Sequence, residues 1–212
     1  MGEFGDTYPM TRNPLYTSPT NSNILMQGRS VNPLDPDSFE PKLEEIIHAL
    51  SNICRFNGHT SRFYSVAEHS LNCALIGHDL YYITTPHCSL YLLLHDGAEA
   101  YLQDLIRPLK QFATDEMLLA EKKITEKIMQ LIPCSDKDRE DFKHPLFQEM
   151  MDEIDTRMAV TEVDTLIPHC KGMLPGYKPY ALEIPAVVSL NVKIVFEITI
   201  KSLMAELTQE TK

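Results

Sequence analysis

The sequence lacks any apolar run that approaches the roughly 20 residues of a transmembrane helix. Its N-terminus also lacks a basic segment followed by an apolar stretch, so we expect neither a membrane span nor a secretion signal. Internal repeats and low-complexity tracts are absent as well. These absences favour a single domain that acts in the cytoplasm.

Cysteine is sparse, and its spacing argues against a zinc knuckle. The five cysteines are odd in number and widely scattered, and no two of them form a CxxC pair. A disulfide framework is equally disfavoured by this pattern. We therefore expect reduced thiols, as in a cytoplasmic protein, at Cys54, Cys73, Cys88, Cys134 and Cys170.

Basic residues are in deficit. The chain has 19 Lys and Arg against 30 Asp and Glu, which gives a net charge of −11. Such a surface repels nucleic-acid backbones, so a general DNA- or RNA-binding role is disfavoured. A small anionic substrate would need a local cationic pocket or a metal ion to overcome this field.

The 212 residues suit one well-buried domain, and 43% of them are hydrophobic. Residues 1–40 are rich in Pro, Asn, Thr and Ser and show no helical period, so we expect an extended arm there. This arm either wraps the domain or reaches a neighbouring subunit. Residues 1–4 are either native or a cloning scar. Residues 41–212 are expected to form one helical domain.

Helical periodicity dominates residues 41–212, which predicts an all-α fold. The last segment is rich in β-branched residues, and this leaves its helical assignment ambiguous. The pattern predicts helices over residues 41–54, 65–80, 86–102, 145–167 and 190–207, with a further amphipathic segment that contains Ile124 and Ile128 and ends at Pro133. Loops are predicted over residues 55–64 and 172–187.

A capping box marks the start of the second predicted helix. Ser65 precedes Val66-Ala67-Glu68, the spacing at which Ser and Glu satisfy each other's backbone donors. His69 therefore lies in or just after the first helical turn.

The run Leu92-Leu93-Leu94-His95-Asp96 is the sharpest feature of the sequence. Three leucines in succession predict a helix that is buried on most sides, and a carboxylate ends the run. Burying an unpaired carboxylate costs several kcal/mol, so Asp96 needs a cation. Imidazole and carboxylate together suit Zn²⁺, Mn²⁺, Co²⁺ or Fe²⁺.

Two further residues are candidate ligands. His69 lies 26 residues before His95, and Asp155 lies on the apolar stripe of its helix between Met151 and Met158. Each has a simpler interpretation: His69 as an ordinary histidine of a capped helix, and Asp155 as the partner of a nearby arginine, Arg157 or Arg139. Together, two His and two Asp would hold one ion and leave positions open for water.

These four residues resemble the H…HD…D signature of the HD-domain superfamily. The stretch from Arg55 to Lys110 (RFNGHTSRFYSVAEHS, then HDGAEAYLQDLIRPLK) resembles the small HD deoxynucleotidases, which include bacterial 5'-deoxynucleotidases and phage dATP triphosphohydrolases. The resemblance covers most of residues 28–167 and is specific over residues 55–110. It implies a helical bundle that requires a divalent metal, with Zn, Co or Mn expected and Mg as the alternative.

The resemblance also implies that Glu99 and Asp104 are catalytic. Glu99 follows His95 by four positions, so on a continuous helix the two share a face. We expect a metal-generated hydroxide to attack the α-phosphorus while Glu99 or Asp104 positions a water or protonates the leaving oxygen. Alternatively, Glu99 is a partner of His95 or a surface residue, and Asp104 is a helix cap.

The substrate-binding residues are also implied by the resemblance. Arg55 matches the arginine that precedes the first metal histidine, and Lys110 matches a phosphate-binding lysine. Arg62 and Arg107 either join them or are surface charges. Phe56 stands where the monophosphatases have Trp, and it either stacks on the sugar or base or anchors its loop in the core.

The function expected from this resemblance is hydrolysis of dATP to deoxyadenosine and triphosphate. The alternatives are a 5'-nucleotidase acting on dNMPs and a non-catalytic binding module of the same fold. The small-molecule deoxynucleotide is the expected partner, with no nucleic acid or membrane. Relatives assemble as homo-oligomers, so we expect an oligomer such as a hexamer, in the host cytoplasm if the protein is of phage origin.

Overall fold

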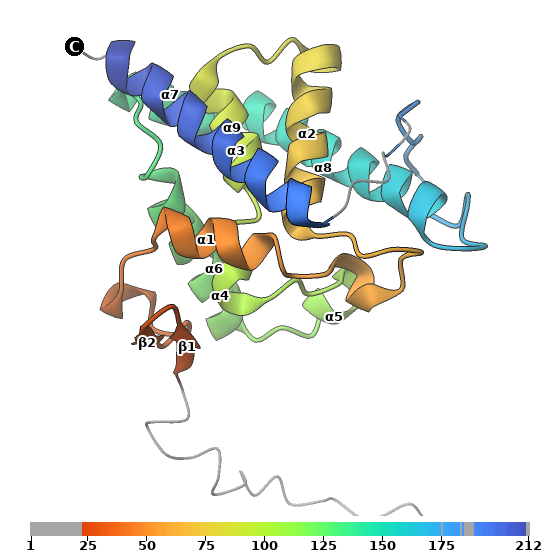
Figure 1. Cartoon of the computed structure of the whole chain (residues 1–212), viewed down its shortest axis with the longest axis horizontal. Helices are drawn as coiled ribbons and strands as arrows, with labels where there is room; N and C mark the ends of the chain where they lie inside the picture. The colour runs from red at the N-terminus through yellow and green to blue at the C-terminus, as the bar shows by residue number, and fades with distance from the viewer. Residues whose placement is uncertain (1–22, 175, 183, 185–188, 211–212) are drawn as a thin grey trace, which may run out of the picture.

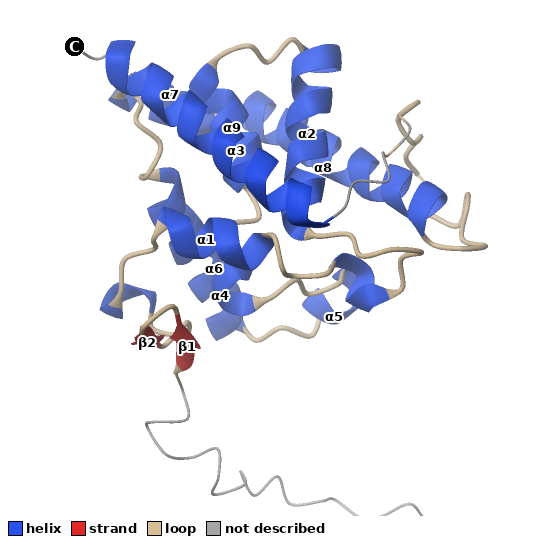
Figure 2. Ribbon diagram, in the orientation of Figure 1, coloured by secondary structure: helices blue, strands red, loops and turns tan. Residues whose placement is uncertain are grey.

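The protein is helical, which confirms the predicted fold class (Figure 1). Its structure, a computed structural model, describes residues 23–174, 176–182, 184 and 189–210. Within this part of the chain, the strands are confined to one short hairpin near its N-terminal end (Figure 2). None of the described helices combines the length and apolarity needed to cross a bilayer.

Part of the expected arm folds onto the helices. Strands β1 (Ile24–Met26) and β2 (Arg29–Val31) pair antiparallel, and a 3-10 turn η3 (Pro36–Ser38) follows them. Val31 and Phe39 are buried in the core. Arg29 donates from Nε and Nη2 to the two carboxylate oxygens of Glu45, at 2.7 and 2.5 Å. Residues 1–22, including the uncertain residues 1–4, lie outside the described part.

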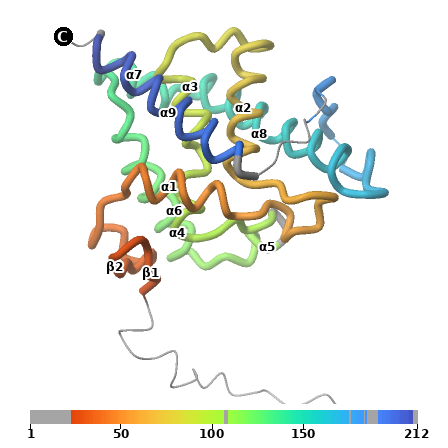
Figure 3. Tube along the Cα trace, viewed as in Figure 1, coloured from red at the N-terminus to blue at the C-terminus, as the bar shows by residue number. Residues whose placement is uncertain are grey.

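The core forms around α3 (Pro86–Leu94), whose side chains Leu92, Leu93 and Leu94 are all buried, as their sequence predicts. This helix packs against α2 (Val66–Tyr81) and α9 (Ser189–Glu210) (Figure 3). Helix α1 (Leu43–Leu50) in turn packs against α2 and α9. A helix that is apolar on most sides requires such neighbours, because any uncovered side would expose its leucines to water.

The remaining helices surround this centre. They are α4 (Glu99–Leu102), α5 (Arg107–Lys110), α6 (Asp115–Met129), α7 (Asp136–Phe142) and α8 (Pro145–Leu166). The long helix α8 packs against α2, and α6 packs against α3. The short helices α5 and α7 were not predicted from the sequence.

The helix predicted over residues 86–102 is wrong at its centre. It ends at Leu94, a tight turn follows over residues 95–98, and α4 begins at Glu99. The turn is built from i to i+3 hydrogen bonds, in which Gly97 N donates to Leu94 O at 2.8 Å and Glu99 N donates to Asp96 O at 3.0 Å. Gly97 makes this tightness sterically feasible, because a Cβ atom there would lie 2.9 Å from Ile128 Cδ1 and from Leu94 O.

The predicted capping box is half correct. Ser65 Oγ accepts a hydrogen bond from Glu68 N at 3.2 Å and caps α2, as expected. The Glu68 carboxylate instead accepts hydrogen bonds from Arg62 at 2.9 and 2.5 Å. A charged partner outcompetes the weaker backbone N–H for this carboxylate.

The ambiguous C-terminal segment is helical. Val192, Phe196, Ile200 and Leu207 are buried at helical spacing. Because these residues cover the core, packing outweighs the low helix propensity of the β-branched residues in α9.

The predicted loop over residues 55–64 contains the turn η4 (Arg55–Gly58). Three successive residues there have positive φ: Phe56 at 53°, Asn57 at 51° and Gly58 at 77°. The loop is held at both ends, since Arg55 N donates to Tyr64 O at 2.9 Å and Ser61 N donates to Leu166 O at 2.7 Å.

Candidate metal centre

Polar side chains meet where three elements adjoin: the first turn of α2, the turn after α3, and the middle of α8. The capped start of α2 supplies His69, the turn supplies His95 and Asp96, and α8 supplies Asp155. Sequence positions almost 90 residues apart thus come together beside the core.

The distances between these groups match those of donors around one ion. His69 Nε2 lies 3.1 Å from Asp155 Oδ1 and 3.6 Å from Asp96 Oδ2, and His95 Nε2 lies 3.3 Å from Asp96 Oδ2. Donors about 2.0–2.2 Å from a metal stand roughly 2.9–3.6 Å apart when the angles between them are about 90–120°. The structure therefore brings together all four residues that the sequence suggested as ligands.

Both histidines present Nε2 to this space, because their other ring nitrogens are already engaged. His69 Nδ1 donates to Glu162 Oε1 at 2.6 Å, and His95 Nδ1 donates to Leu92 O at 2.7 Å. Carboxylate and carbonyl oxygens only accept, so each Nδ1 carries a proton, and in the neutral ring the lone pair is on Nε2. Among the residues that the structure describes, none forms a hydrogen bond with the buried Nε2 of His95.

A lone pair directed at carboxylates is repulsive unless a cation lies between them. When no metal is bound, a proton on His69 can take the place of this cation. Burial opposes the charged imidazole, but Glu162 and Asp155 raise the pKa of His69 well above its ordinary value. Conversely, although burial acts in the other direction, His69 lowers the pKa of Asp155. The donor set of two imidazoles and two carboxylates thus fits a divalent metal as well as it fits this proton.

Glu162 is a buried residue of this cluster that the sequence interpretation missed. Its side chain is fully buried on α8, accepts a hydrogen bond from Tyr64 Oη at 2.7 Å, and lies 3.3 Å from Arg55 Nε. His69 and Arg55 hold its pKa below the usual range despite the burial. The signal was present, since Glu162 lies seven residues after Asp155 and therefore on the same side of the helix.

Cys73 was also missed as a candidate for this site. It lies one helical turn after His69, and its sulfur is 3.4 Å from His69 Nε2. The ligand atoms of His69, Cys73 and His95 all lie within 4.8 Å of one another. Burial raises the pKa of the Cys73 thiol to about 11, so the thiol is protonated at neutral pH when no metal is bound.

Arg55 is buried beside the cluster. Its Nη1 lies 3.3 Å from Asp96 Oδ2, and its Nε faces Glu162. Burial opposes its charge, but Glu162 and Asp96 raise its pKa well above the ordinary value. The Arg55 guanidinium therefore links Asp96, a candidate metal ligand, to Glu162, the carboxylate that orients the ring of His69.

The two expected catalytic acids, Glu99 and Asp104, lie near enough to Asp96 to feel its charge. Burial and the nearby charges of Asp96 and Asp104 raise the pKa of Glu99 well above its usual range. Its Oε2 atom is buried and has no hydrogen-bond partner within the described part of the chain. Burial likewise raises the pKa of Asp104. The expectation that Glu99 and His95 share a face of one continuous helix does not apply, because a turn at residues 95–98 interrupts that helix. Glu99 is instead held near Asp96 by this turn, in which Glu99 N donates to Asp96 O.

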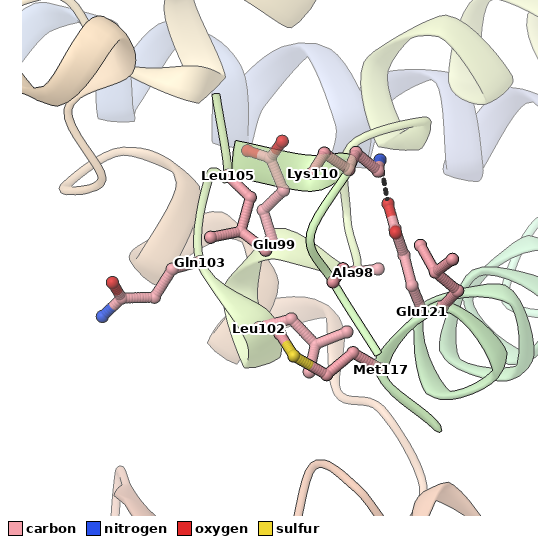
Figure 4. A pocket seen from close by; sticks show the side chains of 10 residues that line it. Ala98, Glu99, Leu102, Gln103, Leu105, Lys110, Met117 and Glu121 are labelled. Atoms are coloured by element: carbon pink, nitrogen blue, oxygen red, sulfur yellow. Dashed lines mark hydrogen bonds and ion pairs between the residues drawn. The ribbon is translucent and has the colours of Figure 1, made fainter. Parts of the chain in front are cut away.

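Glu99 also lines a small pocket formed by α4, α5 and α6 (Figure 4). Lys110 lines the same pocket, with its ammonium group 2.6 Å from Glu121 Oε1. Gln103 and Glu121 also line the pocket, and the remaining walls are apolar, formed by Ala98, Leu102, Leu105, Ala113, Met117 and Leu118.

The other expected substrate residues have varied surroundings. Arg62 is paired with Glu68 and lies over the Tyr64 ring at 5.3 Å. Phe56 is partly exposed, with the Arg55 guanidinium 5.5 Å from its ring centre. The side chain of Arg107 lies outside the described part of the chain.

A model of the HD domain matches residues 47–171, which include every residue of the metal cluster. The chain belongs to the HD-domain family. HD domains are helical and bind divalent metals, in agreement with the fold and donor set described above. The hairpin and α9 lie outside the matched range.

Two curated relatives share only part of their length with this chain. The uncharacterized protein YfdR of Escherichia coli (strain K12) is 40% identical over 80 residues, which are 38% of this chain and 41% of YfdR. The uncharacterized protein RCAP_rcc00048 of Rhodobacter capsulatus is 37% identical over 92 residues, 41% of this chain and 45% of that protein. The matched regions thus span less than half of either relative.

Proposed function

We propose that this HD domain is a phosphohydrolase of deoxynucleotides that converts dATP to deoxyadenosine and triphosphate. Membership of the family implies a metal-dependent phosphohydrolase. The resemblance of the Arg55–Lys110 segment to small HD deoxynucleotidases supports the substrate class. One observation carries the proposal: the Nε2 atoms of two histidines converge on the carboxylates of Asp96 and Asp155 at donor-to-donor distances that suit one ion.

His69, His95, Asp96 and Asp155 would hold the metal. When bound, a divalent ion lowers the pKa of water to ~7 and neutralises charge on the phosphate. Glu162 fixes the ring of His69 through Nδ1, and Leu92 O does the same for His95. Arg55 restrains Asp96 through Nη1 and balances the buried charge of Glu162 through Nε.

Glu99 would supply the proton that the leaving group needs. Cleavage between the α-phosphorus and O5' leaves an alkoxide, and a neutral carboxyl group can protonate it. Burial and the charges of Asp96 and Asp104 keep the proton on Glu99. Asp104 thus acts on the reaction by holding Glu99 in its acid form.

Lys110 would bind the phosphate chain. It lines the pocket with Glu99, and its side chain is about half exposed. A phosphate oxygen would replace Glu121 as the partner of the ammonium group, since a doubly charged phosphate attracts it more strongly than one carboxylate.

The direct test is a panel of dNTPs, NTPs and dNMPs incubated with protein loaded with Zn²⁺, Co²⁺, Mn²⁺ or Mg²⁺, with products separated by ion exchange. Triphosphate released from dATP supports the proposal. Orthophosphate released from dAMP alone would replace it with the 5'-nucleotidase alternative. No turnover of any deoxynucleotide with any metal would refute it.

Matched variants tie the activity to the site. Asp155→Asn should abolish turnover, whereas Asp152→Asn, an exposed carboxylate on the same helix, should leave it unchanged. Equal turnover in the two variants would show that the reaction occurs elsewhere.

A further inference from the structure

Tyr101 ties helix α4 to the N-terminal part of the chain. Its ring is buried and lies 5.1 Å from the ring of Phe39, measured between the ring centres. Its hydroxyl group donates a hydrogen bond to Glu45 Oε2 at 3.3 Å and accepts one from Lys42 N at 3.2 Å. Burial and the nearby Glu45 raise the pKa of Tyr101 to about 12, so the hydroxyl group keeps the proton that it donates.

Arg29 of the hairpin completes this network. It donates to both carboxylate oxygens of the buried Glu45, and its guanidinium lies 5.7 Å from the centre of the Phe39 ring. We refer to Arg29, Phe39, Lys42 and Glu45 as the N-terminal clamp. All four precede residue 47, where the match to the HD domain begins. The clamp therefore adds to the matched domain a set of contacts that converge on α4.

The residue that ends α4 has an unusual backbone conformation. Gln103 has φ 69° and ψ 161°. An ordinary left-handed residue at the end of a helix has ψ near about 47°, whereas the combination at Gln103 is essentially restricted to glycine. The Gln103 side chain is exposed and points away from Glu99 and Lys110, so its burial does not offset the strain (Figure 4).

This conformation turns the chain directly before Asp104. Gln103 N still donates to Glu99 O at 2.8 Å, so the change of direction falls between α4 and Asp104. Asp104 is partly buried, and its charge contributes to the raised pKa of Glu99. A strained residue persists only where the surrounding structure holds the chain around it. On the side of α4, Tyr101 and the clamp supply that restraint.

The simpler interpretation is that Tyr101 only fills the core and that Gln103 is an ordinary helix end. A phenylalanine would fill the same space without the hydroxyl group that binds the clamp. A glycine would end the helix without strain. A hydrogen-bonded anchor and a strained residue two positions later together favour a restraint on the chain over simple packing.

We propose that the N-terminal clamp positions the candidate catalytic acids: through Tyr101 it holds Gln103 in its strained conformation, which keeps Asp104 beside Glu99. The inference rests on the proposed function for the roles of these two acids. Tyr101 and Gln103 are positioning residues, since they act through Glu99 and Asp104. Without the clamp, Gln103 would relax to a conformation of lower energy and Asp104 would move with it.

Hydrogen exchange of the full chain tests the clamp without any turnover. Tyr101→Phe keeps the ring against Phe39 and removes only the hydroxyl group. The amide of Gln103 should then exchange about 10-fold faster, the effect expected when a buried hydrogen bond is lost. The control is Tyr81→Phe, which removes a hydrogen-bonded hydroxyl group at the end of α2 and should leave this amide unchanged. Wild-type exchange of the Gln103 amide in a folded Tyr101→Phe protein overturns the inference.

The strain at Gln103 has a test of its own. Gln103→Gly should raise Tm by about 2–4 °C, because glycine adopts this conformation without strain. Gln111→Gly is the control, since Gln111 has ordinary helical backbone angles and glycine there should lower Tm. A Tm that is unchanged or lowered in Gln103→Gly overturns the inference.

The double variant separates positioning from packing. Tyr101→Phe should lower kcat by up to ~100-fold, the effect of misplacing a catalytic group by about 1 Å, and should change KM little because the metal ligands lie outside α4. Adding Gln103→Gly removes the strain that drives Asp104 away, so kcat and the protection of this amide should both recover. No recovery of protection in the double variant overturns the inference. Absence of turnover in the wild-type protein would refute only the proposed function, and the exchange measurements would still decide the inference.

Discussion

At the scale of single residues, this HD domain concentrates ionisable side chains that control one another's protonation. Burial, Asp96 and Asp104 raise the pKa of Glu99 well above its usual range, while His69 lowers the pKa of Asp155 and of Glu162. Neighbouring carboxyl groups with opposite protonation are typical of hydrolytic sites, where one group donates a proton and others bind a cation.

The raised pKa of Glu99 predicts a pH-dependent stability. Such a group stabilises the fold below its unfolded pKa of about 4.3, and the contribution is lost as the pH rises through the folded-state pKa. Between pH 5 and pH 8, the metal-free wild-type protein should therefore lose stability relative to Glu99→Gln, which is uncharged throughout. Thermal melts at the two pH values measure this difference.

The exposed Glu206 on α9 provides the control for that experiment. Glu206→Gln should keep the wild-type dependence on pH. A Glu99→Gln protein with the same dependence as wild type would contradict the assignment of a buried proton to Glu99.

Glu162 should affect metal binding although it does not face the ion. Glu162→Gln removes the charge that fixes His69 Nδ1–H and that balances Arg55. We expect zinc affinity to fall about 10–100-fold, as is typical when the partner of a ligating histidine is changed. Chelator competition measures it, and Glu153→Gln, a more exposed residue of the same helix, should bind as wild type.

At the scale of elements, the turn between α3 and α4 depends on Gly97. In Gly97→Ala the new Cβ would lie 2.9 Å from both Ile128 Cδ1 and Leu94 O. We expect destabilisation of about 1–3 kcal/mol, the usual cost of overpacking, and loss of turnover because His95 and Asp96 move with the turn. Denaturant unfolding and the nucleotide assay measure the two effects.

A second substitution tests the physical reason. Ile128→Val removes the methyl group nearest to the new Cβ, so Gly97→Ala should be less damaging in that background than in wild type. Strictly additive effects of the two substitutions would show that the contact with α6 is not the cause.

Sequence patterns predicted those elements that local interactions specify. Ser65 caps α2 through a contact three residues away, and the buried leucines of α3 follow from their own run. The break after Leu94 was missed because the close approach to Gly97 comes from Ile128 on another helix. Glu162 lies at helical spacing from Asp155, but only the packing of α2 on α8 shows that it reaches His69.

At the scale of the whole molecule, metal binding should stabilise the fold, because the cluster joins α2, α8 and the end of α3. An ion that binds only the folded protein adds about 2.7 kcal/mol to the free energy of unfolding at 100 times its dissociation constant. Zinc should therefore raise Tm and a chelator should reverse the shift. Calorimetry should show a smaller shift for Asp155→Asn and a wild-type shift for Asp152→Asn.

The backbone of the loop before α2 carries a further consequence. Phe56 and Asn57 hold left-handed conformations, each of which costs a non-glycine residue about 1–3 kcal/mol. The hydrogen bonds at both ends of the loop and the contact of Arg55 with the Phe56 ring offset this conformational free energy when the protein folds. A molecule that binds beside Phe56 would therefore meet a surface that is already ordered, and its association would forfeit little chain entropy.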